Sequence, residues 1–557
     1  NRVVTKVVEL EQGHASVYLG NYTAYSEKKA MIRAAQMKAW LNQQQEIKHQ
    51  EAVITKLKQF NREKSIKRAE SREKMLDKIE VLDKPTEVAS EMRLTLEPSV
   101  ESGNDVLTVT HLAKSFGTNC LFQDLDFDIK RGEKVALIER SEKMYGGTCI
   151  NIGCIPTKTL VHSAHLARRD VSWKEKQEYF RAAMEQKDAV VSFLREKNYE
   201  KLADDPNVTI FLGVGSFAGK NAVEVRGKDL AVTLEAPKIF INTGSETVIP
   251  DLPGVTGNPR VFTSTTLLDL KELPQRLTIV GGGYIGLEFA SMFASFGTQV
   301  TVLEKGPQVL PREDRDIAAA VQGILEKKGV QFKTHVNVTQ IDGGTVVYED
   351  RAAQKEVRLE GDAVLLAAGR RPNTEALALE KAGVEVNARG AIVVDEHLRT
   401  TNPQVYALGD VKGGPLFTYI SLDDFRIVCS SLYGTGDRRI SDRDPVSSTV
   451  FIDPPLAHIG LTAEEAQSLG RHIKVNTLPV AAIPRARTLN QAEGLFKIVV
   501  DADTQEILGC TLFGPEAGEV INTVAVAMKT GQKYTFLRDF IFTHPSMSEA
   551  LNDLANF

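Results

Sequence analysis

The chain has 557 residues, a formal net charge of −5 and 42% hydrophobic residues. This composition is that of an ordinary globular protein and excludes an intrinsically disordered chain. At roughly 100 to 200 residues per domain, the length predicts three to five domains. No apolar run approaches the ~20 residues that a membrane-spanning helix needs, and the N-terminal residues lack a signal-peptide pattern. We therefore expect a cytoplasmic protein, in which five cysteines do not form a disulfide framework.

Residues 26–84 differ from the rest of the chain. They carry 15 Lys and Arg against 9 Asp and Glu, and they contain no Gly or Pro. Trp40, Ile47 and Ile54 recur every seven residues, as in a coiled-coil seam. The pattern predicts an antiparallel helical hairpin whose basic tip is 61–68. Such a segment is either an arm that faces nucleic acid or a solvated coiled coil without a partner.

The order of elements changes along the chain. Residues 85–105 are polar and predict a linker, and residues 106–138 predict strands and turns. From Glu139 onward, apolar strands that end in Gly alternate with helices, which is typical of an α/β fold with a largely parallel sheet. Residues 445–557 predict a separate α+β unit.

Residues 277–304 (LTIVGGGYIGLEFASMFASFGTQVTVLE) hold the clearest motif. A strand leads into Gly281, Gly283 and Gly286, spaced G-x-G-x-x-G, and a helix and a second strand follow. These glycines allow a tight turn and bring a pyrophosphate to the N-terminus of a helix. Glu304 lies 23 residues after Gly281, where a carboxylate would bind a ribose 2′-hydroxyl and repel a 2′-phosphate. The motif predicts NADH binding, and the alternative is a tight turn without a ligand.

Two cysteines, Cys149 and Cys154, stand five positions apart in GGTCINIGCIPTK (146–158). A position at the start of a helix lowers the pKa of a thiol and favours redox chemistry. Two buried structural cysteines and a zinc-binding pair are the alternatives, although no second pair of metal ligands accompanies them.

Near the C-terminus, His544 in FTHPSMSEALNDL (542–554) is followed five residues later by Glu549. A carboxylate that orients an imidazole is the usual arrangement for a general acid-base histidine. Taken alone, the pair is more typical of a surface or helix-capping histidine, and the presence of a dithiol favours the acid-base interpretation.

Together these motifs resemble the pyridine nucleotide-disulfide oxidoreductases over about residues 135–557. Within that family the likeness is closest to the copper(II) reductases of reactive-chlorine resistance, through MYGGTCINIGCIPTKTLVH, LPREDRDIA, FTYISLDDFRIV and TLPVAAIPRAR. The resemblance implies an α/β fold with FAD-binding and NAD(P)-binding domains and an α+β dimerisation domain, so the enzyme would be a homodimer. The implied ranges are 139–263 and 376–444 for FAD, 264–375 for NAD(P), and 445–557 for dimerisation.

The resemblance also implies residue roles. Cys154 would face the flavin, and Cys149 would meet the substrate. His544, oriented by Glu549, would reach the dithiol of the other subunit and act as its proton partner. The residues that would bind FAD or NAD(H) are Glu139, Gly146, Gly147, Thr148, Lys158, Thr243, Gly244, Gly281, Gly283, Gly286, Glu304, Gly369, Asp410 and Phe417. Electrons would pass from NADH through FAD and the Cys149–Cys154 disulfide to an acceptor. The chain carries no C-terminal cysteine pair, which favours a metal ion such as Cu(II) or another oxidant over the substrates of mercuric and thioredoxin reductases.

Residues 1–138 resemble a different family, the ABC-F ATPases. Residues 1–25 would be the end of a first cassette, 26–84 the hairpin that approaches tRNA on the ribosome, and 106–138 the start of a second cassette. The phosphate loop expected after that strand is missing, so we expect no ATP hydrolysis. The G-x-G-x-x-G turn expected for FAD upstream of Glu139 is missing too, which predicts impaired FAD binding. The chain is interpreted as a chimera with its junction at or just before Glu139, either a natural fusion or an error of sequence assembly.

Overall fold

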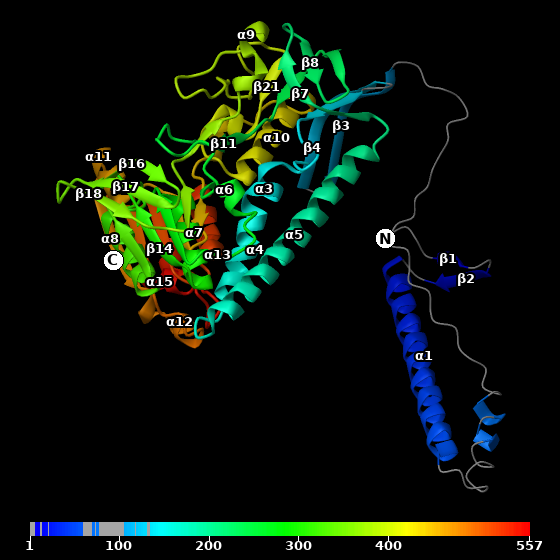
Figure 1. The fold of residues 1–557 in the computed structure, drawn as a ribbon. Coiled ribbons are helices and arrows are strands. Elements are labelled where there is room, and N and C mark those ends of the chain that lie inside the picture. The colour runs from blue at the N-terminus through cyan, green and yellow to red at the C-terminus, as the bar shows by residue number, and fades with distance from the viewer. Residues whose placement is uncertain are drawn as a thin grey trace. The chain divides into compact units, whose positions relative to one another are not determined.

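The computed structural model describes residues 6–11, 14–19, 22–59, 70–72, 74–76, 105–116, 119–130 and 134–557 (Figure 1). The chain divides into two compact units, Asn1–Glu101 and Ser102–Phe557. Among the described residues, no helix is both long and apolar enough to cross a membrane.

The first unit contains a hairpin and a long helix. Strands β1 (Lys6–Glu11) and β2 (His14–Leu19) pair antiparallel, and α1 (Tyr22–Gln59) follows with 38 residues. Ile54 on α1 is buried, while Trp40 and Ile47 are half-buried. The seven-residue spacing therefore places the less exposed side chains on one face of a helix. The expected hairpin tip, 61–68, lies outside the described residues.

The second unit begins with two separate strand pairs. Strands β3 (Asp105–Phe116) and β4 (Asn119–Lys130) form an antiparallel hairpin. Strand β5 (Val135–Glu139) pairs parallel with β6 (Val208–Leu212). The helices between β5 and β6 are α3 (Gly147–Ile152), α4 (Cys154–His165) and α5 (Trp173–Ala203).

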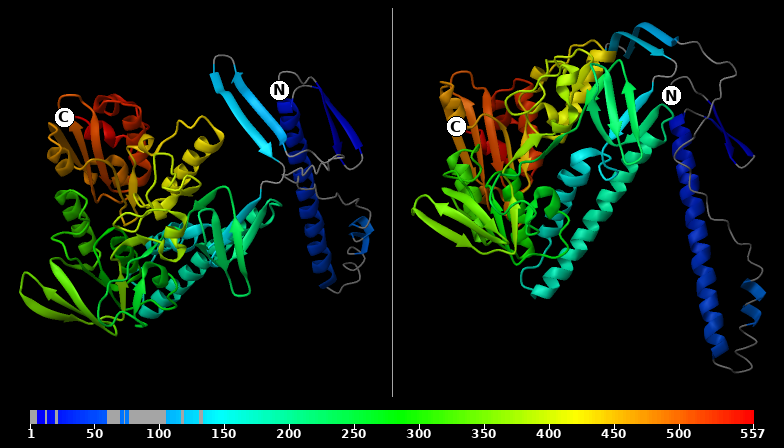
Figure 2. Two further views of the ribbon diagram at one scale, coloured as in Figure 1. Left: turned by 90° about the horizontal axis from the view of Figure 1, so that it is seen from above. Right: turned by 45° about the horizontal axis from the view of Figure 1, so that its top comes forward.

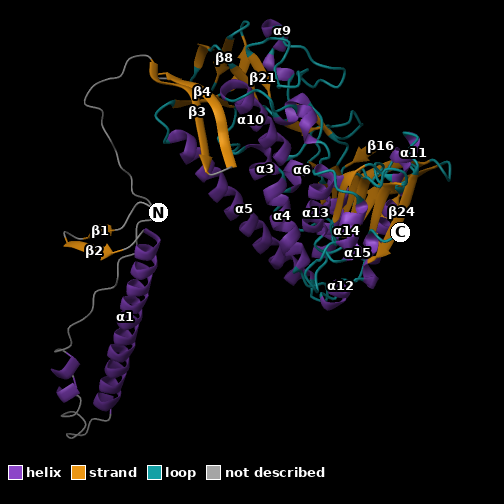
Figure 3. Cartoon of the chain, turned by 180° about the vertical axis from the view of Figure 1, so that it is seen from behind, coloured by secondary structure: helices purple, strands orange, loops and turns teal. Residues whose placement is uncertain are grey.

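An antiparallel meander and several short strands complete this part of the second unit. Its elements are β7 (Val214–Phe217), β8 (Ala222–Arg226), β9 (Ala231–Glu235), β10 (Ile239–Ile241), β11 (Ser245–Thr247), β20 (Arg370–Pro372), α9 (Leu379–Ala382), β21 (Val405–Ala407) and α10 (Thr418–Tyr433). Strand β10 pairs parallel with β21, and the meander has the order β7-β8-β9. Figures 1 and 3 both show β21 beside the meander.

The middle of the chain forms a five-stranded parallel sheet of order β12-β19-β13-β14-β15. Its elements are β12 (Val261–Thr263), α6 (Ser264–Leu267), β13 (Arg276–Val280), α7 (Tyr284–Phe296), β14 (Gln299–Leu303), α8 (Arg315–Lys327), β15 (Val330–Lys333) and β19 (Ala363–Leu366). Between β15 and β19 lies the meander of β16 (Val336–Asp342), β17 (Thr345–Asp350) and β18 (Lys355–Leu359).

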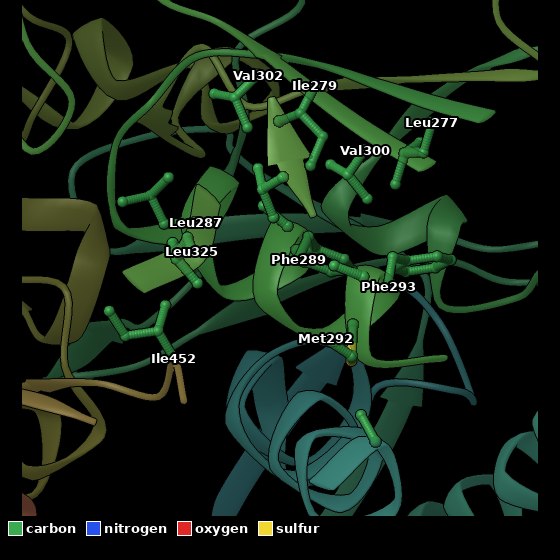
Figure 4. Packing of buried hydrophobic residues seen from close by; sticks show 14 of the residues in the cluster. Leu277, Ile279, Leu287, Phe289, Met292, Phe293, Val300, Val302, Leu325 and Ile452 are labelled. Atoms are coloured by element: carbon green, nitrogen blue, oxygen red, sulfur yellow. The ribbon is translucent and has the colours of Figure 1, made fainter. Parts of the chain in front are cut away.

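The largest core of the second unit is built on α7. Leu287, Phe289 and Phe293 on this helix are almost fully buried, and they pack with Ile279 of β13 and Val300 of β14 (Figure 4). Strands that are covered on both faces read as continuous apolar runs, which is why the sequence pattern identified this sheet.

The C-terminal part is a five-stranded antiparallel sheet of order β22-β23-β26-β25-β24 (Figure 2). Its elements are β22 (Ser448–Val450), β23 (Leu456–Gly460), α11 (Ala463–Ser468), β24 (Ile473–Pro479), α12 (Pro484–Thr488), β25 (Leu495–Asp501), β26 (Ile507–Phe513), α13 (Ala517–Lys529), α14 (Tyr534–Asp539) and α15 (Ala550–Leu554). The expected combination of α/β domains with a C-terminal α+β domain is confirmed.

Candidate active site

The two redox-candidate cysteines lie on consecutive short helices. Cys149 lies in α3, and Cys154 is the first residue of α4. The sequence suggested one helix, but the chain breaks at Gly153, where an added Cβ would stand 2.9 Å from the carbonyl oxygen of Thr148. This close approach requires glycine, and it starts a new helix at Cys154, where the positive end of the helix dipole favours a thiolate.

A buried asparagine holds the loop that carries the cysteines. The Nδ2 of Asn151 donates to the carbonyl oxygens of Tyr145 at 2.9 Å and Gly147 at 2.8 Å. Arg195 Nε on α5 donates to Asn151 Oδ1 at 2.7 Å. Sequence reasoning missed Asn151, although an amide between two cysteines in a Gly-rich turn could have indicated it.

The two thiols differ in their electrostatics. The hydrogen bond from Cys149, together with Thr418 and Lys158, lowers the pKa of Cys154 to about 6 against the effect of burial. The same hydrogen bond and burial raise the pKa of Cys149. Cys149 is therefore the protonated donor and Cys154 the thiolate near neutral pH. Thr418, the first residue of α10, lies with its Oγ1 3.6 Å from Cys154 Sγ, and the sequence did not single it out.

A lysine–glutamate pair lies one helical turn beyond Cys154. Lys158 Nζ contacts Glu288 Oε2 at 2.9 Å, and it stands 4.6 Å from the ring centroid of Phe451. The backbone N–H of Phe451 donates to Glu288 Oε1 at 2.8 Å. Lys158 was expected near a flavin, whereas Glu288 and Phe451 were missed because they come from α7 and from the C-terminal domain.

The other residues that the resemblance assigned to flavin gather at the carboxyl ends of strands. Glu139 ends β5, Gly244 follows β10, and Asp410 follows β21. An added Cβ on Gly244 would stand 3.4 Å from Thr148 Oγ1, so the loops after β5 and β10 meet. In parallel sheets, ligands bind beyond the carboxyl ends of the strands.

Hydrogen bonds fix several of these residues. Ser245 Oγ donates to Asp410 Oδ2 at 2.7 Å, and Arg370 Nε donates to Ser245 Oγ at 2.9 Å. Thr243 Oγ1 donates to the carbonyl oxygen of Asn373 at 2.8 Å. The ring of Phe417 stacks on Tyr419, with 5.0 Å between centroids.

Three of the assigned glycines have positive φ values, and two of them also provide open backbone. Gly146, Gly147 and Gly369 have φ values of 88°, 73° and 111°. An added Cβ on Gly147 or Gly369 would meet no atom within 4 Å. Backbone that is exposed in this way admits a flat ligand closely.

These residues suit one end of an FAD molecule and not the other. The pyrophosphate of a dinucleotide needs backbone N–H groups at the start of a helix. Among the described residues of the second unit that precede β5, the chain forms the β3–β4 hairpin and no helix. The described residues of the site therefore suit the ring and ribityl chain of a flavin, and they include no strand, Gly-rich turn and helix directly before β5 that would hold the phosphates.

The dinucleotide motif of the middle sheet is complete. An added Cβ on Gly286 would stand 2.1 Å from the carbonyl oxygen of Gly281, and one on Gly283 would meet no atom within 4 Å. Glu304 Oε2 accepts from the N–H of Gly282 at 2.7 Å, and Oε1 accepts from the N–H of Gly306 at 2.7 Å. The carboxylate thus lies against the glycine turn, where an NADH ribose would be bound.

The candidate acid-base pair lies in the C-terminal domain. His544 Nδ1 is 2.7 Å from Glu549 Oε2, and the side chain of His544 is 71% exposed. Thr418 contacts Cys154, and the described residues of one chain show no contact that joins His544 or Glu549 to the cysteines. The role of His544 at a second subunit stays a prediction.

Comparison with known proteins identifies the family. Residues 125–424 match the model of the pyridine nucleotide-disulphide oxidoreductases, and residues 446–555 match the dimerisation domain of that family. The chain belongs to the pyridine nucleotide-disulphide oxidoreductase family, which depends on FAD and NAD(P)H. Residues 8–94 match a separate model described as ABC transporter, which confirms the resemblance over that range. Residues 125–138, expected to belong to an ABC cassette, lie within the oxidoreductase match.

Named relatives include several flavoprotein reductases. The chain is 50% identical over 428 residues to RclA of Escherichia coli strain K12, covering 76% of this chain and 94% of that protein. It is 34% identical to mercuric reductase of Staphylococcus aureus (76% and 77% covered) and 35% identical to mitochondrial dihydrolipoyl dehydrogenase of Pisum sativum (76% and 86%). A solved Cu(II) complex of E. coli RclA, titled an HOCl-induced flavoprotein disulfide reductase, matches with a TM-score of 0.71 at 49% identity, covering 76% of this chain and 93% of that chain. The expected enzyme class, an NAD(P)H-dependent flavoprotein disulfide reductase, is confirmed.

Proposed function

We propose that the dithiol of this chain passes electrons to Cu(II), with NADH as the ultimate electron donor. The observation that carries the proposal is the placement of Cys149 in α3 and of Cys154 at the start of α4, where Cys154 is exposed and its Sγ lies 3.6 Å from Thr418 Oγ1. The Cu(II) complex of a relative that is 49% identical supports the choice of acceptor.

In the proposed step, Cys149 and Cys154 each lose one electron and form a disulfide. Two Cu(II) ions each gain one electron and become Cu(I). The proton of Cys149 must leave in the same step, because a thiolate and not a thiol forms the new bond. His544 of a second subunit, oriented by Glu549 at 2.7 Å, is the proposed acceptor of that proton.

We infer a preference for NADH over NADPH from Glu304. Its carboxylate is fixed by two backbone N–H groups at the position where a ribose 2′-hydroxyl would bind. A 2′-phosphate at that point would meet the negative charge of Glu304.

We further propose that the C-terminal domain forms a homodimer. Phe536 and Phe540 are 42% and 47% exposed, and Ile541 is 92% exposed. Large apolar side chains that gather on a surface mark an interaction site, and residues 446–555 match a dimerisation domain.

A single-turnover experiment tests the acceptor step. The chain is reduced with dithiothreitol, freed of reductant and mixed with Cu(II) and a Cu(I)-specific chromophore. We expect two Cu(I) per chain, lost in Cys149→Ser and in Cys154→Ser and retained in Cys429→Ser, since Cys429 stands apart from the pair. Equal yields from all four proteins would refute the proposal.

Fluorescence titration with NADH and NADPH tests the nucleotide preference.

A second candidate function belongs to residues 26–84. Their match to the ABC transporter model and the basic composition of this segment favour contact with ribosomal RNA. Co-sedimentation with ribosomes that weakens with salt and disappears on deletion of residues 26–84 would support this function. Absence of co-sedimentation at low salt would contradict it.

A further inference from the structure

A buried carboxylate lies between the nucleotide turn and the C-terminal domain. Tyr284, the first residue of α7, directly follows Gly283 of the glycine turn, and its hydroxyl donates to Glu313 Oε1 at 3.0 Å. Glu313 Oε2 lies 3.6 Å from Nδ1 of His458 on β23. The Glu313 side chain therefore connects the start of α7, where a pyrophosphate would bind, to the C-terminal sheet.

Glu313 lacks the partners that normally hold a buried carboxylate in its ionised form. Its side chain is 3% exposed, and among the described residues its Oε2 has no hydrogen-bond partner. The adjacent Asp314 has the usual arrangement, because its Oδ2 lies 2.8 Å from Lys497 Nζ. A buried carboxylate oxygen without a donor is costly as an anion, and uptake of a proton removes that cost. Burial accordingly raises the pKa of Glu313.

Charged and titratable groups face Glu313 from α7, β23, α11 and its own loop. After burial, the largest influence on the pKa of Glu313 is His458, which lowers it. The hydroxyl of Tyr284 on α7 also lowers this pKa. Asp314, the next residue of the loop, and Glu465 on α11 raise it. Further negative charge at the start of α7 would act in the same direction as these two carboxylates and favour the protonated form of Glu313.

The ring of His458 presents an acceptor to Glu313. His458 Nε2 lies 2.9 Å from the carbonyl oxygen of Gly460, and a carbonyl only accepts, so Nε2 carries a hydrogen. Nδ1 lies 2.8 Å from Thr511 Oγ1 and is an acceptor in the neutral ring. A proton taken up from solvent can therefore reside on Glu313 Oε2 or on His458 Nδ1, and it belongs to the pair.

We propose that binding of NADH is accompanied by uptake of up to one proton at the pair of Glu313 and His458, and that Glu313 is a positioning residue that acts on the nucleotide through Tyr284. The inference rests on the proposed NADH site at the glycine turn. The bound pyrophosphate brings negative charge to the N-terminus of α7, beside Tyr284. That charge favours the protonated pair, and the proton comes from solvent.

The pH dependence follows from linkage. The pair has a higher pKa in the complex than in the free chain, because the pyrophosphate disfavours the ionised carboxylate. Affinity for the nucleotide is therefore highest at low pH, where the pair is protonated before binding. It falls as the pH rises from the pKa of the free chain to that of the complex, and it is constant again above both.

The test is isothermal titration calorimetry of the whole chain with ADP-ribose, which carries the pyrophosphate and cannot transfer hydride. Each titration is run in two buffers that differ in their enthalpy of ionisation, and the difference in heat gives the number of protons taken up. We expect a substantial fraction of one proton in the native chain. We also expect the affinity to fall by about tenfold as the pH rises through the titration of the pair, which corresponds to a pKa change of about one unit.

Three variants locate the proton. Glu313→Gln keeps an oxygen for Tyr284 and resembles the protonated acid, so it should bind without proton uptake and, at every pH, with the affinity of the native chain at low pH. Tyr284→Phe removes a hydrogen bond that lowers the pKa of Glu313, so the pH range of uptake should move upward. Glu464→Gln is the matched control on α11, where the Glu464 side chain is 63% exposed, and it should retain the native uptake.

Each outcome separates this inference from the nucleotide site itself. Binding of ADP-ribose by the native chain without proton uptake would overturn the inference and leave the nucleotide site standing, and this result needs no variant to fold. Native uptake in Glu313→Gln, or equal loss in Glu464→Gln, would overturn the assignment to Glu313. An unchanged pH range in Tyr284→Phe would overturn the role of Tyr284. Absence of binding at every pH would overturn both the nucleotide site and the inference.

Discussion

Replacing Thr418 by valine removes the hydroxyl that lies 3.6 Å from Cys154 Sγ and keeps the shape of the side chain. A hydrogen bond to a charged group contributes about 1.5–3 kcal/mol. Because the contact between the Thr418 hydroxyl and Cys154 Sγ is long, we place its contribution at the lower end of this range. Since 1.36 kcal/mol corresponds to one pKa unit, the thiolate loses about one unit of stabilisation. The pKa of Cys154, lowered to about 6 in the native site, should rise toward 7 in the variant.

The assay is the rate of iodoacetamide labelling at Cys154 as a function of pH, read by peptide mass spectrometry on the reduced chain. The thiolate is the reactive form, so the rate falls as the pH drops through the pKa. Thr418→Ser, which keeps the hydroxyl, should retain the native midpoint. An unchanged midpoint in Thr418→Val, or an equal shift in Thr418→Ser, would refute the role given to this hydroxyl.

Three further predictions concern the nucleotide turn, the core and the dimer. Gly286→Ala would place a Cβ 2.1 Å from the Gly281 carbonyl, so we expect fluorescence titration to show loss of NADH binding; native affinity would contradict the close approach. Phe289→Ala, at 1% exposure, should cost about 3–5 kcal/mol in urea unfolding, whereas Phe193→Ala, at 59% exposure, should cost little; equal costs would contradict this packing. Ile541→Glu should convert a dimer to monomers by light scattering without changing the unfolding midpoint, and a stable dimer would exclude this surface.

Local sequence patterns predicted the parts of the site whose residues are close in the chain. The turn of Gly281 and its acidic partner Glu304 lie within one strand–helix–strand unit, and its spacing follows from the geometry of that unit. His544 and Glu549 are five residues apart and form the expected contact. The two α/β parts and the C-terminal α+β part followed from the alternation of apolar strands with helices.

Contacts between distant segments could not be predicted in this way. Cys154 and Thr418 are 264 positions apart, and Lys158 and Glu288 are 130 positions apart. In the sequence, each of these residues looks like an ordinary residue of a helix. Their contacts depend on how α4, α7 and α10 pack against one another. The same limit applies to the pairing of β5 with β6 and of β10 with β21, because strand neighbours are set by tertiary structure.

Glu288 has a consequence for how such reductases can exchange segments by recombination. Its carboxylate bonds Lys158 on one side and the backbone of Phe451 on the other, so it joins three segments that are far apart in sequence. A crossover between related genes anywhere from codon 158 to codon 451 would divide this trio between two parents. Such hybrids would keep the contact only when both parents carry the matching residues. A junction near residue 138, by contrast, leaves all three in one inherited block.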